Sequence, residues 1–300
     1  MELEICADRI VARIPAEKAA ELLELIEQHL SKNVLSIKEV RSIAGKAMNI
    51  ASLIYFWRPF LACFWAALTL ETSMHVQNCI WVKQIAPALY WLRAFLKREQ
   101  GVIERTFTLD ADYNRVLCLE ITTDASPWGI GGWVALNHEP LAWFAGKVTP
   151  SDATALQREL GTHLAQQAFE ALAILVAIRL WKTLWRAKRV SLRVRSDNVG
   201  ALTVISALKG RGAALTLVAR ELAFEFSDCE YSPDVIEHLP GVANTVADVL
   251  SRRFDPSKAQ NWQVPHFLLS VPEVALPERI VEWWKTLAPP THSSPVEPHA

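Results

Sequence analysis

Residues 115–148, RVLCLEITTDASPWGIGGWVALNHEPLAWFAGKV, decide the fold class. Three runs within them, RVLCLEITTDAS, GIGGWVALN and PLAWFAGKV, are rich in apolar residues and separated by turn residues, so they predict three successive strands. The remainder predicts a helix at 153–187, a strand at VSLRVRSDN, helices at 199–208 and 213–226, a strand at 229–239 and a helix at 243–252. This β-β-β-α-β-α-α-β-α order predicts a mixed sheet with helices packed on it, an α/β layered domain.

The two ends of the chain differ from this central part. Residues 1–100 show helical spacing of apolar residues, and Ser36 with Glu39 forms a capping-box pattern, so a mostly helical region is expected. Residues 101–114 are polar and contain Gly101, which predicts a linker. Residues 255–300 hold half of all prolines and predict a loosely ordered tail. The α/β domain is therefore placed at 115–254.

Composition limits the function classes. The net charge is −1, so no overall basic field favours nucleic acid, and any such binding must be local. Five scattered cysteines without CxxC spacing argue against a disulfide or zinc framework. We expect an intracellular protein, cytoplasmic and/or nuclear. Residues 50–70 are long enough to span a bilayer, but Arg58 and Pro59 at their middle favour a buried helical pair over a membrane protein.

Four carboxylates stand at positions where they can converge. Asp124 ends the first strand, Asp197 follows the strand LRVRS, Glu170 interrupts an apolar helix, and Asp248 lies on the final helix. Acids at strand ends and on helices above those ends can meet at one edge of a sheet. Four converging carboxylates repel one another unless hard cations neutralise them, which favours Mg²⁺ or Mn²⁺. Two such ions about 4 Å apart would activate water on a phosphodiester.

Each acid also has a simpler interpretation. Asp124 could cap a turn, and Asp197 with the following asparagine could cap the next helix. Glu170 could lie at the edge of a polar helix face. Asp248 could pair with Arg252 or with the arginine after it. The combination of all four acids, in this order, is what favours the metal site.

Four segments carry a resemblance to a known family: TDASPWGIGG, FEALAILVAIRLW, RSDNVGAL and EHLPGVANTVADVLSR. Over residues 115–254 the chain resembles type 1 ribonuclease H in the form fused to retrotransposon reverse transcriptases. The resemblance implies a ribonuclease H-like mixed five-stranded sheet with flanking helices. It also implies hydrolysis of the RNA strand of an RNA–DNA hybrid with two Mg²⁺ ions, for which Mn²⁺ could substitute.

The resemblance also implies roles for individual residues. Asp124 would bridge both ions, Asp248 would hold the ion on the water side, and Glu170 and Asp197 the ion on the leaving-group side. His238 would aid proton transfer or product release, although it could be a solvated turn histidine. The expected nucleic-acid contacts are Ser126, Asn198, Lys209, Arg211 and Asn244. Asn244 would order the loop before the last helix, with an ordinary helix cap as the alternative.

Residues 1–100 also resemble the segment between a reverse-transcriptase palm and its ribonuclease, through RIPAEKAAELLELIEQHL and SIKEVRSIAGKAMNIA. No tyrosine is followed by the x-Asp-Asp of a polymerase palm. The expected partners are therefore an RNA–DNA hybrid and a polymerase portion encoded upstream, with no membrane. The alternative is a decayed or domesticated fragment that binds nucleic acid or protein without catalysis.

Overall fold

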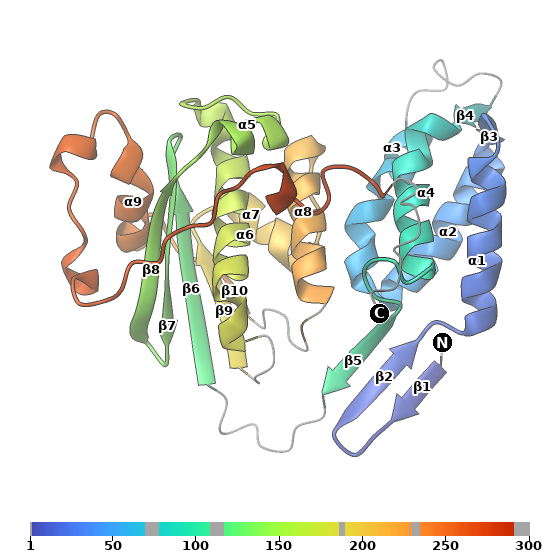
Figure 1. Ribbon diagram of the computed structural model, residues 1–300, viewed down its shortest axis with the longest axis horizontal. Coiled ribbons are helices and arrows are strands. Elements are labelled where there is room, and N and C mark those ends of the chain that lie inside the picture. The colour runs from blue at the N-terminus through green and yellow to red at the C-terminus, as the bar shows by residue number, and fades with distance from the viewer. Residues whose placement is uncertain are drawn as a thin grey trace, which may run out of the picture. The chain divides into compact units, whose positions relative to one another are not determined.

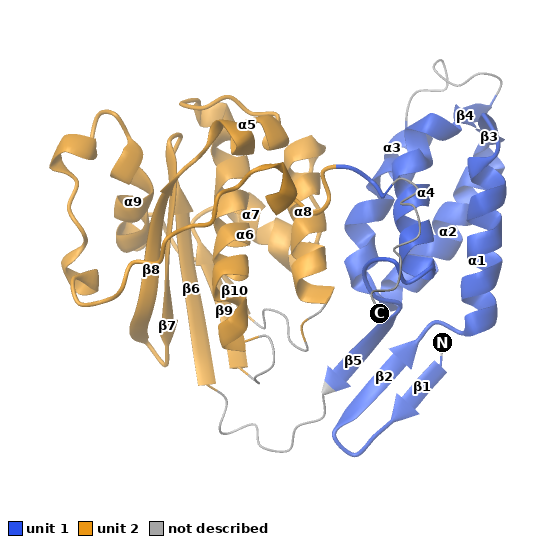
Figure 2. Ribbon diagram, in the orientation of Figure 1, with its two compact units in different colours: residues 1–109, 288–300 blue, residues 110–287 orange. Residues whose placement is uncertain are grey.

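The computed structural model describes residues 2–69, 78–108, 117–185, 190–227, 229 and 235–290. The chain divides into two compact units, residues 1–109 with 288–300, and residues 110–287 (Figure 2). The linker predicted at 101–114 is wrong for Glu104–Thr108, which form strand β5 of the first unit. Its later part lies outside the described residues.

The first unit combines helices with two small sheets. Its helices are α1 (Ala16–Leu30), α2 (Ile37–Leu53), η1 (Tyr55–Leu61), α3 (Ala62–Thr69) and α4 (Val82–Leu96). Strands β1 (Glu2–Ile5), β2 (Arg9–Arg13) and β5 form an antiparallel sheet, and β3 (Val34–Ser36) pairs with β4 (Cys79–Trp81). The capping box of Ser36 and Glu39 does open α2. The helical prediction missed the strands because runs of three to five residues are too short to show a period.

Residues 50–69 cover the end of α2, the 3-10 helix η1 and α3. Three of their aromatic side chains face inward, with Trp57, Phe60 and Phe64 each at most 1% exposed, whereas Trp65 is exposed. In the described part of the chain, the single helix long and apolar enough to cross a membrane is His163–Trp185, with up to one more if a bent pair, 199–207 with 212–227, counts as one span. Within its most apolar window, 72% is buried inside the protein, as expected of a core helix.

The second unit contains a five-stranded mixed sheet in the order β10-β9-β6-β7-β8 (Figure 1). Its strands are β6 (Leu117–Ala125), β7 (Gly129–Leu136), β8 (Glu139–Lys147), β9 (Val190–Ser196) and β10 (Val235–His238). β7 runs antiparallel to both β6 and β8, whereas β9 is parallel to both β6 and β10. This is a ribonuclease H-like sheet with flanking helices, and the predicted fold class is confirmed.

Helices cover both faces of this sheet. They are α5 (Pro150–Leu156), η4 (His163–Ala165), α6 (Gln166–Trp185), α7 (Val199–Ala207), α8 (Gly212–Ser227) and α9 (Thr245–Ser251). A Cβ added at Gly131 would meet α9, whereas one at Gly132 would meet Phe144, which packs on Trp181 of α6. Because successive strand residues face opposite sides, α9 and α6 lie on opposite faces of the sheet.

The continuous helix predicted at 153–187 is wrong, because the structure divides it in two. Thr149 caps α5 one residue before Pro150, and the left-handed Gln157 ends that helix after seven residues. Gly161 then takes a positive φ of 77°, and η4 leads into α6. The apolar periodicity of the two helices hid the break.

Residues 255–287, which we call the C-terminal strap, pack on the second unit rather than forming the loosely ordered tail that the prolines predict. Leu268, Arg279 and Trp284 of the strap are at most 4% exposed. Val274 N–H donates to the carbonyl of Trp143 at 2.8 Å, and Trp143 N–H donates to Pro272. Proline content alone does not predict this packing, because the strap is held by a few side chains that are widely spaced among the prolines. Residues 291–300 lie outside the described residues.

Candidate metal centre

Three of the four expected acids meet at one edge of the sheet. Asp124 lies near the end of β6, Asp197 directly follows β9, and Glu170 lies in the second turn of α6. Each offers a carboxylate oxygen within 4.8 Å of those of the other two. Asp124 is 4% and Glu170 is 2% exposed. The structure thus brings together a buried triad of hard oxygen ligands.

The sheet topology explains this convergence. Strands β6 and β9 are parallel neighbours with Thr122 beside Arg195, so their carboxyl ends reach the same edge. Asp124 and Asp197 each lie two residues beyond that pair. Helix α6 crosses the sheet with its apolar side inward, which carries Glu170 to the same place. The alternative that Glu170 belongs to a polar helix face is wrong.

Two carboxyl groups of the triad have raised pKa values. Burial, together with the charges of Asp197 and Asp248, raises the pKa of Asp124 to about 7, although the hydroxyl of Ser251 acts in the opposite direction. Burial and the charges of Asp124 and Asp197 raise the pKa of Glu170 well above its ordinary value. Both carboxylates therefore favour a proton or another cation at neutral pH.

Two polar side chains that the sequence analysis missed hold the acids in place. Gln166 Nε2 donates to Glu170 Oε1 at 3.0 Å and also to the carbonyl of Ala125. The other oxygen, Glu170 Oε2, is buried without a hydrogen-bond partner in the structure. Ser251 Oγ lies 2.6 Å from Asp124 Oδ2 and 2.9 Å from the carbonyl of Asp248. The i,i+4 spacing of Gln166 and Glu170 could have predicted their contact from the sequence. The contact of Ser251 with Asp124 could not be predicted in this way, because 127 positions separate the two residues.

Asp248 lies at the border of the triad. Its Oδ1 pairs with Arg252 Nε at 2.7 Å and Nη2 at 2.6 Å, and its side chain is 39% exposed. The ion-pair interpretation of Asp248 is therefore confirmed. Its charge still reaches Asp124, whose pKa it raises. Asp248 thus lies close enough to act electrostatically on the triad, but it is not one of the three acids whose oxygens lie within 4.8 Å of one another.

The loop that contains His238, Pro240 and Gly241 lies beside Asp197. His238 is exposed at the end of β10, and its Nε2 lies 3.0 Å from the carbonyl oxygen of Asp197. A Cβ on Gly241 would lie 3.2 Å from Asp197 Oδ2, so glycine lets this loop approach the carboxylate closely. His238 therefore lies beside the backbone of Asp197.

Three of the five residues expected to contact nucleic acid instead have internal partners. Ser126, 1% exposed, accepts from the backbone N–H of Trp128 and Gly129, so Ser126 stabilises the turn that Asp124 was suspected of capping. The prediction of a Ser126 nucleic-acid contact is wrong because its hydroxyl is enclosed.

Asn244 is also buried, at 2% exposed, and its Nδ2 donates to the carbonyl of Thr123 at 3.1 Å. This hydrogen bond joins the loop to β6. Asn244 occupies the N-cap position of α9 but makes no side-chain hydrogen bond to the helix, and its burial contradicts a direct nucleic-acid contact. Asn198, not Asp197, caps α7 by accepting from Ala201 N–H. Lys209 and Arg211 are exposed in the turn between α7 and α8.

Glycine at position 131 lets α9 pack directly on β7. An added Cβ would lie 2.5 Å from both Leu250 Cβ and Ser251 N, and backbone cannot give way as a flexible side chain can. We expect Gly131→Ala to lower the free energy of unfolding by about 1–3 kcal/mol, as overpacking does. Urea denaturation measures this change.

The matched control is Gly45→Ala, because nothing lies within 4 Å of a Cβ at that position in α2. It should raise stability by about 0.5–1 kcal/mol, the ordinary gain of alanine over glycine in a helix. A Gly131→Ala protein as stable as wild type would show that α9 is not seated tightly on the sheet.

The raised pKa values predict an unusual dependence of stability on pH. A carboxyl whose pKa is higher in the folded state binds protons more tightly there, so stability falls as pH rises from about 4 to 7. The contribution of Asp124 to stability is lost as pH rises through about 7. We expect urea denaturation in EDTA to show this fall, and Glu170→Gln to reduce its slope. A slope unchanged by that substitution would contradict the buried repulsion.

Comparisons with known proteins add little. No protein-family profile and no curated protein matches the chain. Two solved structures of a foamy viral protease-reverse transcriptase are similar to it. The complex with an RNA/DNA hybrid is 15% identical over 75% of this chain and 28% of that chain, with a TM-score of 0.29. The dRH form with double-stranded DNA is 14% identical over 73% and 35%, with a TM-score of 0.25.

The chain spans about a third or less of the length of these two structures. At such low scores the likeness carries no argument about function. The fold class rests on the order and direction of the strands, and the candidate centre rests on its own geometry.

Proposed function

We propose that the protein hydrolyses the RNA strand of RNA–DNA hybrids in a reaction that depends on Mg²⁺. The observation that carries this proposal is the convergence of Asp124, Glu170 and Asp197, with oxygens within 4.8 Å of one another, at one edge of a ribonuclease H-like sheet. Three carboxylates from β6, α6 and the end of β9 form this centre, and Asp248 borders it. This arrangement fits the acid set that the sequence motifs imply.

The residues present fit divalent cations. All three ligands are carboxylates, the donor type that Mg²⁺ and Mn²⁺ prefer. Glu170 Oε2 is buried without a hydrogen-bond partner in the structure, and the raised pKa of Asp124 indicates unneutralised negative charge. We propose that Asp124, Glu170 and Asp197 hold one Mg²⁺ and that Asp124 with Asp248 holds a second. Mn²⁺ would substitute.

Bound Mg²⁺ would supply an activated water and charge stabilisation for the leaving oxygen of a phosphodiester. The chain supplies the rest. Gln166 orients Glu170, and Ser251 fixes one oxygen of Asp124. His238, exposed beside Asp197, is placed to exchange a proton with solvent or with the departing strand. Arg252 holds the carboxylate of Asp248 next to the centre.

The proposed substrate is a hybrid duplex, contacted through phosphates by Lys209 and Arg211 in the α7–α8 turn. Four described basic residues between positions 179 and 195 instead have acidic partners within the protein. Arg179 and Lys182 pair with Glu225, and Arg193 and Arg195 pair with acids on β6 and β10. Binding should therefore be weak and salt-sensitive. We propose that an upstream polymerase portion of a reverse transcriptase supplies the remaining contacts.

The test uses the full chain and a hybrid whose two strands carry different labels. We expect the RNA strand to be cut in Mg²⁺ and both strands to stay intact in EDTA. Single-stranded RNA and double-stranded DNA should not be cut. Hybrid binding without Mg²⁺-dependent cutting would overturn the proposal in favour of a non-catalytic binding module.

A further inference from the structure

The C-terminal strap connects the two faces of the sheet that carry the candidate centre. It leaves α9, which bears Asp248 and Ser251, and ends against α6 and α8 on the opposite face. Figure 1 shows it running from α9 past β8 towards α8. Each of its three parts makes contacts of a different kind.

The first part of the strap supports α9. This helix has seven residues and no side-chain cap, so it is too short to be stable by itself. Trp262 Nε1 donates to the carbonyl of Val249 in α9 at 2.6 Å. Leu268 of the strap is fully buried in a small core with Leu250 of α9 and Trp143 of β8. The position of α9 therefore depends on strap residues.

The middle of the strap is fixed along the outer edge of the sheet. Residues 272–274 make a short parallel bridge to Trp143 of the edge strand β8. Arg279 then inserts between β8 and α5. Its Nε lies 3.0 Å from both carboxylate oxygens of Asp152, and its Nη2 donates to the carbonyl of Lys147 at 2.5 Å. Arg279 is 4% and Asp152 is 0% exposed, so this ion pair is fully enclosed.

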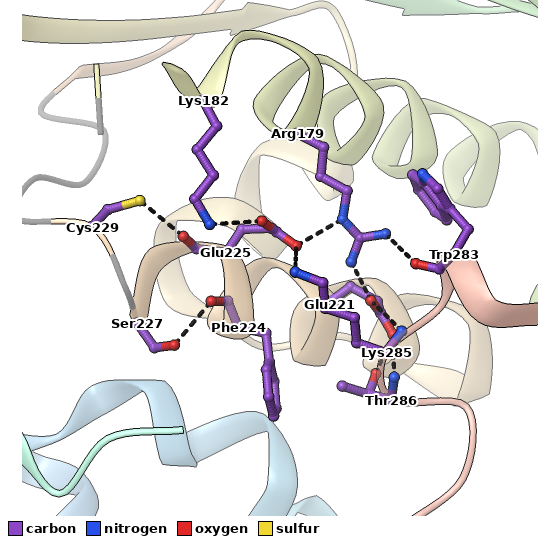
Figure 3. Close-up of polar contacts among 10 residues, drawn as sticks. All are labelled: Arg179, Lys182, Glu221, Phe224, Glu225, Ser227, Cys229, Trp283, Lys285 and Thr286. Atoms are coloured by element: carbon purple, nitrogen blue, oxygen red, sulfur yellow. Dashed lines mark hydrogen bonds and ion pairs between the residues drawn. The ribbon is translucent and has the colours of Figure 1, made fainter. Parts of the chain in front are cut away.

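The last part of the strap joins a buried charge cluster between α6 and α8 (Figure 3). Thr286 N–H donates to Glu221 Oε1 at 2.6 Å, and Lys285 Nζ donates to Glu225 Oε1 at 2.8 Å. Arg179 of α6 donates to the carbonyl of Trp283 at 2.8 Å. The strap is thus attached to the helix that also carries Glu170.

We propose that the C-terminal strap positions the candidate metal centre: Trp262 and Arg279 act through α9 to hold Asp248 and Ser251 against Asp124. Trp262 bonds Val249, and Arg279 bonds Asp152 and Lys147, none of which is a proposed metal ligand, so Trp262 and Arg279 are positioning residues. The proposed effect of the strap on the order of α9 does not depend on catalytic activity. Its effect on turnover rests on the proposed function.

The first experiment measures amide hydrogen exchange, peptide by peptide, in the full chain. Trp262→Phe keeps an aromatic ring and removes the N–H donated to Val249. We expect exchange in α9 to become about fivefold faster, as for the loss of one hydrogen bond, while exchange in α6 stays unchanged. Val281→Ala, at a strap residue that is 66% exposed, is the matched control and should change neither helix.

Arg279→Met tests the middle of the strap. The single substitution leaves the buried carboxylate of Asp152 without its arginine. It is therefore compared with the double variant Asp152→Asn/Arg279→Met, which removes both charges. The asparagine keeps an oxygen to accept from Thr149 N–H, as Asp152 does at 2.9 Å. We expect the double variant to fold and to exchange α9 amides on the order of tenfold faster than wild type.

The second measurement is the Mg²⁺ concentration that gives half-maximal hybrid cleavage, which we expect Trp262→Phe to raise about tenfold, as loss of a ligand-orienting contact does. Faster exchange confined to α9 supports the strap proposal even if wild type cuts no hybrid, and that absence would overturn only the proposed function. Unchanged exchange in α9, or equal acceleration in α6 and α9, would overturn the strap proposal whatever the cleavage result.

Discussion

Asp124→Asn should abolish Mg²⁺-dependent cleavage of the hybrid, with a loss of about 10³-fold or more. The expected size follows from metal-ion stabilisation of a transition state by several kcal/mol. Asp124 interacts with several other members of the site: it belongs to the triad, accepts from Ser251 and is affected by the charge of Asp248. Single-turnover cleavage of a labelled hybrid measures the loss.

The same substitution should stabilise the metal-free fold. Asparagine removes a buried charge whose pKa is raised to about 7, and relief of that repulsion should increase the free energy of unfolding by roughly 2 kcal/mol at pH 8. Asp8→Asn is the control, because Asp8 is an exposed acid of the first unit, outside the triad. This control substitution should change neither the cleavage rate nor the free energy of unfolding of the metal-free protein. Loss of cleavage together with lost stability would indicate misfolding instead.

Arg179→Met should produce the largest loss of stability. Arg179 joins α6 to Glu221 and Glu225 of α8 and to the strap carbonyl of Trp283 (Figure 3). The two glutamates are 0% and 2% exposed, so removal of their shared arginine leaves buried charge undercompensated. We expect the free energy of unfolding to fall by about 3–5 kcal/mol in urea denaturation. Arg13→Met, at an exposed ion pair, should cause no measurable change.

This cluster also has a pH signature opposite to that of the triad. Burial alone would raise the pKa of Glu225, but the charges of Arg179 and Lys285 lower it to about 2. A depressed carboxyl pKa gives stability that is present above about pH 4.5 and is lost as pH falls towards 2. Arg179→Met should flatten this acid limb. An unchanged limb would mean that the cluster does not stabilise the fold.

The strands and the acids of the second unit could be predicted because each has a local signal. The three runs of residues 115–148 are rich in apolar residues and are separated by turn residues, and β6, β7 and β8 follow them closely. Asp124 and Asp197 were assigned from their places at strand ends. Parallel pairing of β6 and β9, which the mixed sheet required, then brings them together.

What could not be predicted depends on contacts between distant residues. Ser251 reaches Asp124 across 127 positions, and Arg279 reaches Asp152 across the same separation. Neither pair leaves a periodic trace in the sequence. The prolines of residues 255–300 suggested a loosely ordered tail, because composition records the average of a segment and not the few side chains that anchor it. Ser126 was misassigned for a similar reason: its motif position was visible, but its enclosure under α9 was not.

The most direct test of the central claim is titration calorimetry of Mg²⁺ into the full chain and into Glu170→Gln. This substitution is isosteric and leaves Gln166 a carbonyl oxygen to bond, but it removes one charge from the triad. We expect saturable Mg²⁺ binding by wild type that weakens at least about tenfold in Glu170→Gln. Equal Mg²⁺ binding by the two proteins, or none by wild type, would contradict it.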